Sequence, residues 1–197
     1  MLNPLDPVTL EGSIIRLEPA HERHVHGLFE VGADDAIWKA MIGPIRTTIP
    51  DFEDLVRRMI AGRDAGEQNP FVVVEKASDR VIGSTRLYDF SPVHMHIEIG
   101  HTWYAKEQRG TKVNPESKFL LLRHCFETCG LTRVQIKTNE KNAVSRAAIL
   151  KLGASFEGIL RKHMRLADGT MRNTAMYSIT DDDWPMVMER LLERLAE

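Results

Sequence analysis

The sequence predicts one α+β (mixed α/β) domain spanning residues 1–197, with a mostly antiparallel, twisted sheet of about seven strands flanked by helices. Three observations support this fold class. Residues 71–104 hold three β-rich runs separated by turn signals, which indicates an antiparallel meander. A helical pattern over 115–129 lies between two strands, which indicates a strand–helix–strand crossover. The last third combines a hairpin pattern with an amphipathic helix. We expect the core of the domain to span about 11–184.

The first third of the chain predicts a strand, two helices and a long loop. Apolar and polar residues alternate over 13–18, and two segments with helical spacing follow. The segment 39–50 has two prolines and no clear period, so we expect a loop, and long loops in compact domains are often functional. Asp51 is the expected N-cap of the second helix. The residues at helical spacing are Val25, Leu28 and Phe29 in the first helix, and Phe52, Leu55 and Met59 in the second.

The remaining elements follow from the same periodicities and from glycine stop signals. In chain order they are strands at 71–75, 80–88 and 94–104, a helix over 115–129 ended by Gly130, a strand at 132–138, a helix over 142–152 ended by Gly153, strands at 156–164 and 173–179 around a turn at 167–170, and a helix over 183–197. The last helix carries an apolar stripe that could mediate a homodimer or cover the sheet, and we favour the covering role.

Composition and charge exclude several classes of function. The net charge is −2, with acidic and basic residues mixed along the chain, so nothing indicates a nucleic-acid footprint or a polybasic membrane signal. The N-terminus lacks a basic segment followed by an apolar run, and no stretch of eighteen apolar residues occurs. Cys125 and Cys129, four residues apart in an apolar helical pattern, are typical of core packing. We therefore expect a cytoplasmic protein with a small-molecule partner.

A turn at 109–116, with the sequence RGTKVNPE, is the central chemical signal. Gly110 suits a tight turn, Asn114 is the expected N-cap and Pro115 fits the first helical turn. A helix start directs unpaired backbone N–H groups and the positive end of the helix dipole toward one point, which favours a phosphate.

Arg109 and Lys112 would add positive charge to this turn. The segment lacks the GxxxxGK[ST] pattern of nucleotide-binding loops and the GxGxxG pattern of dinucleotide-binding folds. An anion other than NTP or NAD is thus expected. The alternative is a well-capped helix with two solvated basic residues and no ligand.

Four segments of the chain resemble the GNAT superfamily of N-acetyltransferases, and in particular its ribosomal-protein N-terminal acetyltransferase-like (RimJ/RimL-type) branch. They are GSIIRLEP at 12–19, IEIGHTWY at 97–104, RGTKVNPESKFLLLRHCFE at 109–127 and VQIKTNEKNAVSRAAILKLGASFEGILRKH at 134–163. The resemblance implies a GNAT-like fold in which two parallel strands splay apart. It also implies transfer of an acetyl group from acetyl-CoA, as cosubstrate, to an amine acceptor, without a metal.

In that superfamily the phosphate loop follows the pattern [RQ]-x-x-G-x-[GA], and both of its small positions are replaced here, by Lys112 and Asn114. We therefore expect the backbone amides of the turn, more than its side chains, to hold the pyrophosphate of CoA. Gly110 can supply the conformational freedom that Lys112 lacks. The residues that the resemblance assigns to the cofactor are Arg109, Gly110, Thr111, Lys112, Val113, Asn114, Asn142 and Trp103.

The resemblance implies direct attack of an amine on the thioester, so an amine that is protonated at neutral pH needs a base. Glu98 is the candidate general base, and a surface or ion-paired glutamate is the alternative. A bulge is expected between Glu98 and Thr102, with Gly100 as a plausible site for it. Ser145 is the candidate proton donor to the CoA thiolate. Asn142 would contact the cofactor, cap the helix that follows, or do both.

The identity of the acceptor stays open between a protein N-terminus and a small amine. Trp38, Met41 and Ile45, near the 39–50 loop, could line the acceptor pocket or simply pack beneath the loop. Histidines cluster at 21, 24 and 26 and at 94, 96 and 101, but without acidic or cysteine partners at ligand spacing we expect no metal. The alternative to an enzyme is a non-catalytic acyl-CoA-binding sensor or interaction module of the same fold.

Overall fold

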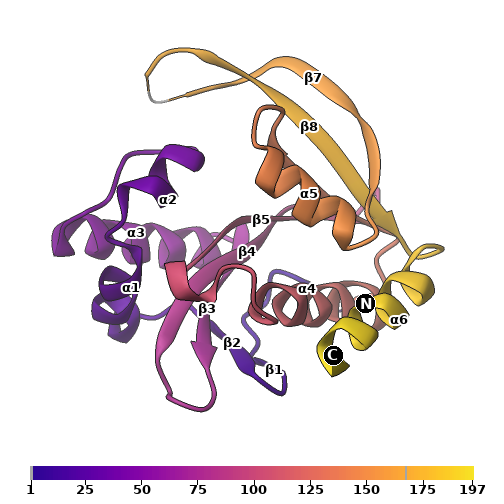
Figure 1. Ribbon diagram of the computed structural model, residues 1–197, viewed down its shortest axis with the longest axis horizontal. Coiled ribbons are helices and arrows are strands. Elements are labelled where there is room, and N and C mark those ends of the chain that lie inside the picture. The colour runs from indigo at the N-terminus through magenta and orange to yellow at the C-terminus, as the bar shows by residue number, and fades with distance from the viewer. Residues whose placement is uncertain (1, 167) are drawn as a thin grey trace.

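The computed structural model describes residues 2–166 and 168–197, in which eight strands form one sheet with helices on both faces (Figure 1). The strand order is β1-β2-β3-β4-β5-β6-β8-β7. All neighbours are antiparallel except β5 and β6, which confirms the predicted fold class. The strands are β1 (Leu10–Glu11), β2 (Ile15–Pro19), β3 (Gln68–Glu75), β4 (Val81–Ser91), β5 (His96–Tyr104), β6 (Arg133–Asn139), β7 (Ser155–Arg165) and β8 (Met171–Thr180). The short β1 is the strand that the sequence did not predict.

Helices pack on both faces of the sheet because strands such as β3 are apolar on both sides. Phe71 and Val73 join the core beneath α4 and α6, whereas Val72 and Val74 join a second core with α1, α2 and α3. None of the helices in the described part of the chain is long and apolar enough to cross a membrane. The helices are α1 (Val25–Gly32), α2 (Asp35–Ala40), α3 (Ile49–Asp64), α4 (Val113–Arg123), α5 (Ala143–Lys151) and α6 (Trp184–Ala196), with short helical turns η1 (Glu22–His24), η2 (Lys106–Gln108) and η3 (His124–Thr128).

Two predicted helix starts are wrong by a few residues. The N-cap of α3 is Thr48, not Asp51, because Asp51 occupies the third helical position and its carboxylate closes a capping box with Thr48. The N-cap of α4 is Lys112, not Asn114, because the turn at Gly110 is completed earlier and the Thr111 hydroxyl accepts the Val113 amide.

Other boundaries differ from the prediction in their details. The expected loop at 39–50 is shortened by α2 at one end and by α3 at the other. The expected helix over 115–129 changes to a π-helical turn at His124 and ends, as predicted, at Gly130 with positive φ. In the predicted turn at 167–170, Ala167 lies outside the described residues, while the Asp168 carboxylate accepts the Thr170 amide.

The apolar stripe of α6 is buried within the chain. Trp184, Val187 and Leu191 are at most 6% exposed, and α6 packs along α4. The Trp184 ring stacks on Phe126 and its N–H donates to Glu127. The stripe therefore covers the core rather than offering a free face for a dimer.

The parallel pair separates after three residues. His96, Ile97 and Glu98 of β5 pair with 133–135 of β6, and the two strands then diverge. Beyond that point β6 stays paired with β8 along its whole length, and β5 stays paired with β4. The predicted splay is confirmed, and each strand is held on its outer side only.

A bulge in β5 lies within the predicted interval. Ser84 of β4 pairs with Trp103, and Arg86 of β4 pairs with Gly100. Thr85, the single residue between Ser84 and Arg86, therefore lies opposite two residues of β5, His101 and Thr102. His101 has a φ of 50°. The extra residue is thus at His101–Thr102 rather than at Gly100, whose lack of a side chain instead makes room for the Tyr88 ring.

Glu116, in the first turn of α4, ties this helix to the start of β2. Its carboxylate accepts the backbone amides of Ser13, Ile14 and Ile15 at 2.7, 2.8 and 2.7 Å. A Cβ at Gly12 would lie 2.5 Å from the Glu116 carboxyl carbon, so only glycine leaves room for this contact. The contact fixes the end of α4 that borders the groove described below.

We expect Glu116→Gln to lower the free energy of unfolding by about 2–4 kcal/mol, because an amide cannot accept three N–H groups as a carboxylate does. Urea denaturation measures this change. Glu107→Gln, at an exposed position, serves as the control and should stay within about 0.5 kcal/mol of the parent. A loss below about 1 kcal/mol for Glu116→Gln would contradict the anchoring role.

Candidate active site

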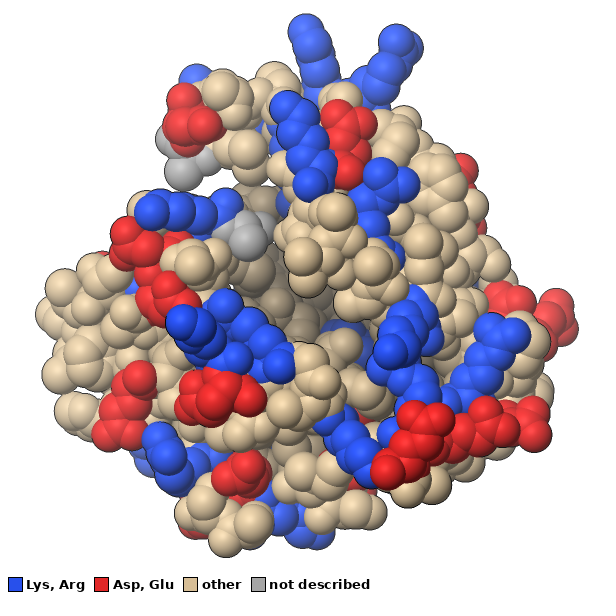
Figure 2. All heavy atoms as spheres, in the orientation of Figure 1, with Lys and Arg blue, Asp and Glu red and all other residues tan. Residues whose placement is uncertain are grey.

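A groove of about 480 Å³ opens where β5 and β6 diverge. Figure 2 shows a hollow near the centre of this face, with Lys and Arg side chains gathered around it. The groove walls include 99–104 of β5, 136–138 of β6, the turn at 108–110, Asn114 and Lys118 of α4, Asn142 and Ser145 at the start of α5, Met41 and Ile42 after α2, Tyr88 of β4 and Arg172 of β8. Most of the residues that the sequence assigned to a cofactor or to catalysis therefore meet at one place.

The anion-binding turn borders one end of this groove. Arg109, Gly110 and Asn114 line it, and Gly110 takes a φ of 80° that a side chain would make costly. The amides of residues 110–112 precede the first residue of α4, so they take no part in the hydrogen-bond ladder of that helix. The turn thus has the geometry to hold a phosphate.

Three of the predicted cofactor residues have their side chains elsewhere. The Lys112 ammonium donates to the carbonyl of Leu195 at 2.9 Å, Val113 is buried in the core, and the Thr111 hydroxyl donates to the Gln108 carbonyl. Lys112 has a φ of −70°, so lysine causes no backbone strain at this usually small position. For these residues only the backbone is available to a ligand at the turn.

Asn142 and Ser145 lie together on the opposite wall. The Asn142 side chain accepts the Ser145 amide at 3.0 Å, so Asn142 is the predicted N-cap of α5. Both residues also line the groove. This cap uses the backbone amide of Ser145 and not its hydroxyl. It therefore fixes the backbone of Ser145 and leaves the hydroxyl available to a ligand in the groove.

Glu98 is completely buried beneath the groove. Its carboxylate forms an ion pair with the Lys137 ammonium at 2.7 Å and accepts the Tyr88 hydroxyl. Burial raises the pKa of Glu98, and burial next to that carboxylate raises the pKa of Tyr88. Tyr88 and Lys137 line the groove whereas Glu98 does not, so this carboxylate reaches the groove only through its partners.

Lys118 is a groove residue that the sequence reasoning missed. It is 5% exposed and donates to the Thr102 hydroxyl, in the bulge of β5, at 2.8 Å. Across residues 2–166 and 168–197, no carboxylate lies within 4.0 Å of its ammonium, and burial lowers its pKa to about 7. The available signal was a lysine on the apolar face of α4, at helical spacing from Leu121, Leu122 and Cys125.

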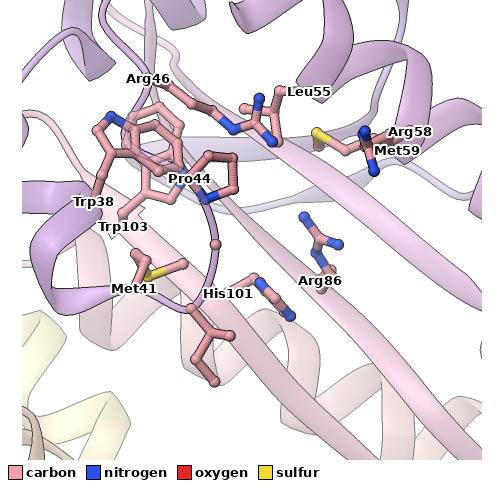
Figure 3. Close-up of a pocket in the computed structure, with 12 residues that line it drawn as sticks. Trp38, Met41, Pro44, Arg46, Leu55, Arg58, Met59, Arg86, His101 and Trp103 are labelled. Carbon is pink, nitrogen blue, oxygen red and sulfur yellow. The ribbon is translucent and has the colours of Figure 1, made fainter. Parts of the chain in front are cut away.

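A second cavity, of about 130 Å³, adjoins the groove (Figure 3). Met41, Ile42, His101 and Trp103 line both spaces, so they form the boundary between them. Trp38, expected either to line an acceptor pocket or to pack beneath the loop, lines this cavity, with its ring 5.5 Å from that of Trp103. Ile45, predicted as a third lining residue, is 49% exposed and is absent from the wall of this cavity.

The histidines of the two sequence clusters have separate environments. His24 is buried against Glu18, whereas His94 and His96 stack on each other. His101 stands between the groove and the cavity, where burial and the nearby Arg86 lower its pKa to about 3. No group of three or more metal-ligating side chains occurs among the residues described.

Comparison with known proteins gives one consistent result. Residues 15–155 match the Acetyltransferase (GNAT) domain family. A GCN5-related N-acetyltransferase from Brucella melitensis is 26% identical, with a TM-score of 0.89 over 95% of this chain and 85% of that one. A candidate acetyltransferase from T. thermophilus is 31% identical, with a TM-score of 0.87 over 96% and 97% of the two chains.

A more distant structure extends the comparison to the branch that the sequence resembles. Mycobacterium smegmatis RimJ in complex with CoA-disulfide is 21% identical, with a TM-score of 0.82 over 98% of this chain and 97% of that one. At this identity the likeness concerns the fold. Comparison with curated proteins gives no match.

We expect Lys118→Met to stabilise the ligand-free protein at pH 6.5 by on the order of 1–3 kcal/mol, because a buried, unpaired ammonium is costly. The pKa of Lys118 is lowered from 10.5 to about 7 in the folded state, so the unfolded state binds more protons between these values. The cost is therefore fully present below pH 7 and fades as the pH rises toward 10.5. Urea denaturation at pH 6.5 and pH 9.5 measures it.

Lys151→Met removes an exposed lysine and should change stability little at either pH. A Lys118→Met variant that is less stable than the parent at pH 6.5, or whose gain does not shrink at pH 9.5, would contradict the assignment of Lys118 as an uncompensated buried cation.

Proposed function

The chain belongs to the GNAT acetyltransferase family, and on this basis we propose that it transfers the acetyl group of acetyl-CoA to a primary amine, by direct attack in a ternary complex. The acceptor is a protein N-terminus or a small amine. One observation carries the proposal: the splay of β5 and β6 opens a groove that has the start of α4 at one end and Ser145 on its wall.

The groove fits the chemistry of CoA. The amides of 110–112 and the positive end of the α4 dipole suit a pyrophosphate, with Arg109 beside them. The inner edges of β5 and β6 beyond Glu98 and Gln135 are not paired with each other, so an extended pantetheine arm can take the place of a missing strand. The thioester would then lie near the bulge at His101–Thr102.

The transfer itself requires a neutral amine. Its nitrogen attacks the thioester carbonyl carbon, the C–N bond forms, the C–S bond breaks and CoA leaves as a thiolate. The carbonyl oxygen carries negative charge in between, and the Lys118 ammonium beside Thr102 supplies positive charge at that end of the groove. Ser145 is the proposed hydrogen-bond donor to the departing thiolate.

Glu98 is the proposed acceptor of the amine proton, acting through Tyr88. Tyr88 lines the groove and donates its hydroxyl proton to Glu98, so a proton taken up by the Tyr88 oxygen can be matched by one passed to the carboxylate. Burial raises the pKa of Glu98, which makes the carboxylate a better proton acceptor. The ion pair with Lys137 keeps the carboxylate charged before the reaction.

The competing proposal is a sensor that binds acyl-CoA without turnover. Thiol release from acetyl-CoA, measured with a panel of primary amines, separates the two functions, and mass spectrometry of the acceptor identifies the product. The protein thiols give little background in this assay because Cys125 and Cys129 are at most 1% exposed. We expect amine-dependent release with one acetylated product per thiol. Calorimetric binding of CoA without release for any amine would favour the sensor.

Ser145→Ala should lower kcat roughly 10- to 100-fold and leave the Kd for CoA within about threefold, because the hydroxyl acts on the leaving group.

Glu98→Gln and Tyr88→Phe should each lower kcat, and the double variant should be no slower than the slower of the two single variants, because the two residues form one relay. Ser155→Ala, at an exposed site on β7, is the control. Unchanged kcat in Ser145→Ala, or fully additive losses at Glu98 and Tyr88, would contradict these roles.

A further inference from the structure

The smaller cavity beside the groove is lined by three arginines. Arg46 enters it from the loop before α3, Arg58 from α3 and Arg86 from β4. In Figure 3 the three guanidinium groups lie around the same space, with His101 on the side of the groove. We call this space the arginine chamber.

The positive charge of the chamber is only partly balanced. The Asp54 carboxylate pairs with Arg46 at 3.4 Å, with Arg58 at 2.8 Å and, outside the chamber, with Arg57 at 3.7 Å. Arg86 donates to the neutral Gln68 side chain at 2.6 Å, and within the described part of the chain its Nε has no hydrogen-bond partner and no carboxylate lies within 4.0 Å. One acidic group therefore faces three cations.

Arg86 keeps its charge in this position. Burial lowers its pKa to about 10, which still leaves the guanidinium protonated at neutral pH. The residue is half-buried and its unused Nε is shielded from solvent, and such a cation is costly unless a ligand supplies the opposite charge. The planar guanidinium suits a carboxylate, which can accept two parallel N–H groups.

The size and lining of the chamber limit what can enter. A volume of about 130 Å³ has room for a carboxylate and a few carbon atoms. Trp38, Leu55 and Met59 supply apolar walls. A polyamine or an aminoglycoside would bring positive charge into a space that already has an excess of it.

The chamber opens toward the groove at His101, whose neutral ring does not repel an ammonium group. We propose that the acceptor is a small amine that carries a carboxylate, as an amino acid does, with the carboxylate bound by Arg86 in the arginine chamber and the amine at the boundary with the groove. This inference rests on the proposed acetyl transfer and names the class of its acceptor.

The test compares L-alanine, L-methionine and L-glutamate with their α-carboxamides and with spermidine, in the thiol-release assay. We expect kcat/KM to be roughly 10- to 100-fold higher for at least one acid than for its amide. Arg86→Gln should remove this preference because it lowers kcat/KM for the acid and not for the amide. Arg86→Lys should retain part of the preference. Arg80→Gln, which removes a charge from an exposed position between β3 and β4, should leave the preference unchanged.

Calorimetry with the same amino acids, in the presence of CoA, gives a second readout that needs no turnover. Binding of the acid should be lost in Arg86→Gln and weakened in Arg58→Gln, whose side chain is 75% exposed and can be replaced without disturbing the core. Faster release with amides or spermidine, or an acid preference that survives in Arg86→Gln, would overturn this inference and leave acetyl transfer intact. Binding of the acid to the parent, without release for any amine, would support the arginine chamber and contradict acetyl transfer.

Discussion

The early end of pairing between β5 and β6 is the constraint on which the site depends. Each strand is held on its outer side, β6 by β8 and β5 by β4, so neither can move across to close the gap. The bulge at His101–Thr102 adds a residue to β5 within the diverging region and turns the strand locally. Beyond Glu98 and Gln135, the backbone N–H and C=O groups on the facing edges of β5 and β6 are not paired with each other. A ligand in the gap can supply the partners that such groups need. Glu116 holds the start of α4 at one end of this gap.

Charge gives the site its second property, which is a deficit of anions. Lys118 in the groove is buried and Arg86 in the arginine chamber is half-buried, and neither has a carboxylate partner among the described residues. Such groups destabilise the free protein and are stabilised when an anion binds. CoA brings phosphates and a developing oxyanion, and an amino acid brings a carboxylate. The ligand-free protein would thus have a lower free energy of unfolding, and binding of the two substrates would raise it.

The sequence predicted the fold well where a local pattern carries the information. Alternation marked the strands around the splay, and Gly130, Gly153 and Asn142 marked helix ends because their special backbone roles are local. The start of α4 was misplaced because the helix already begins at Val113, where the Thr111 hydroxyl accepts the first helical amide, so Asn114 lies inside the helix. The α2 helix, of six residues, is too short to show a period.

The site was only partly predictable, because burial and partners depend on distant segments. Ser145 and Asn142 lie in a motif, whereas Lys118 and Arg86 acquire their importance because no carboxylate among the described residues pairs with them, which no local pattern reveals. Glu98 was found through its place on β5, but its ion pair with Lys137 arises from the parallel register. The arginine chamber joins β4, α3 and the loop before it, which meet only in the folded chain.

A crystal structure of the protein with CoA tests the central claim most directly. The splay predicts the pantetheine arm between β5 and β6, alongside residues 99–103, and the pyrophosphate within hydrogen-bond distance of the amides of 110–112. CoA bound on another surface, with the gap between β5 and β6 filled by side chains or water alone, would contradict it.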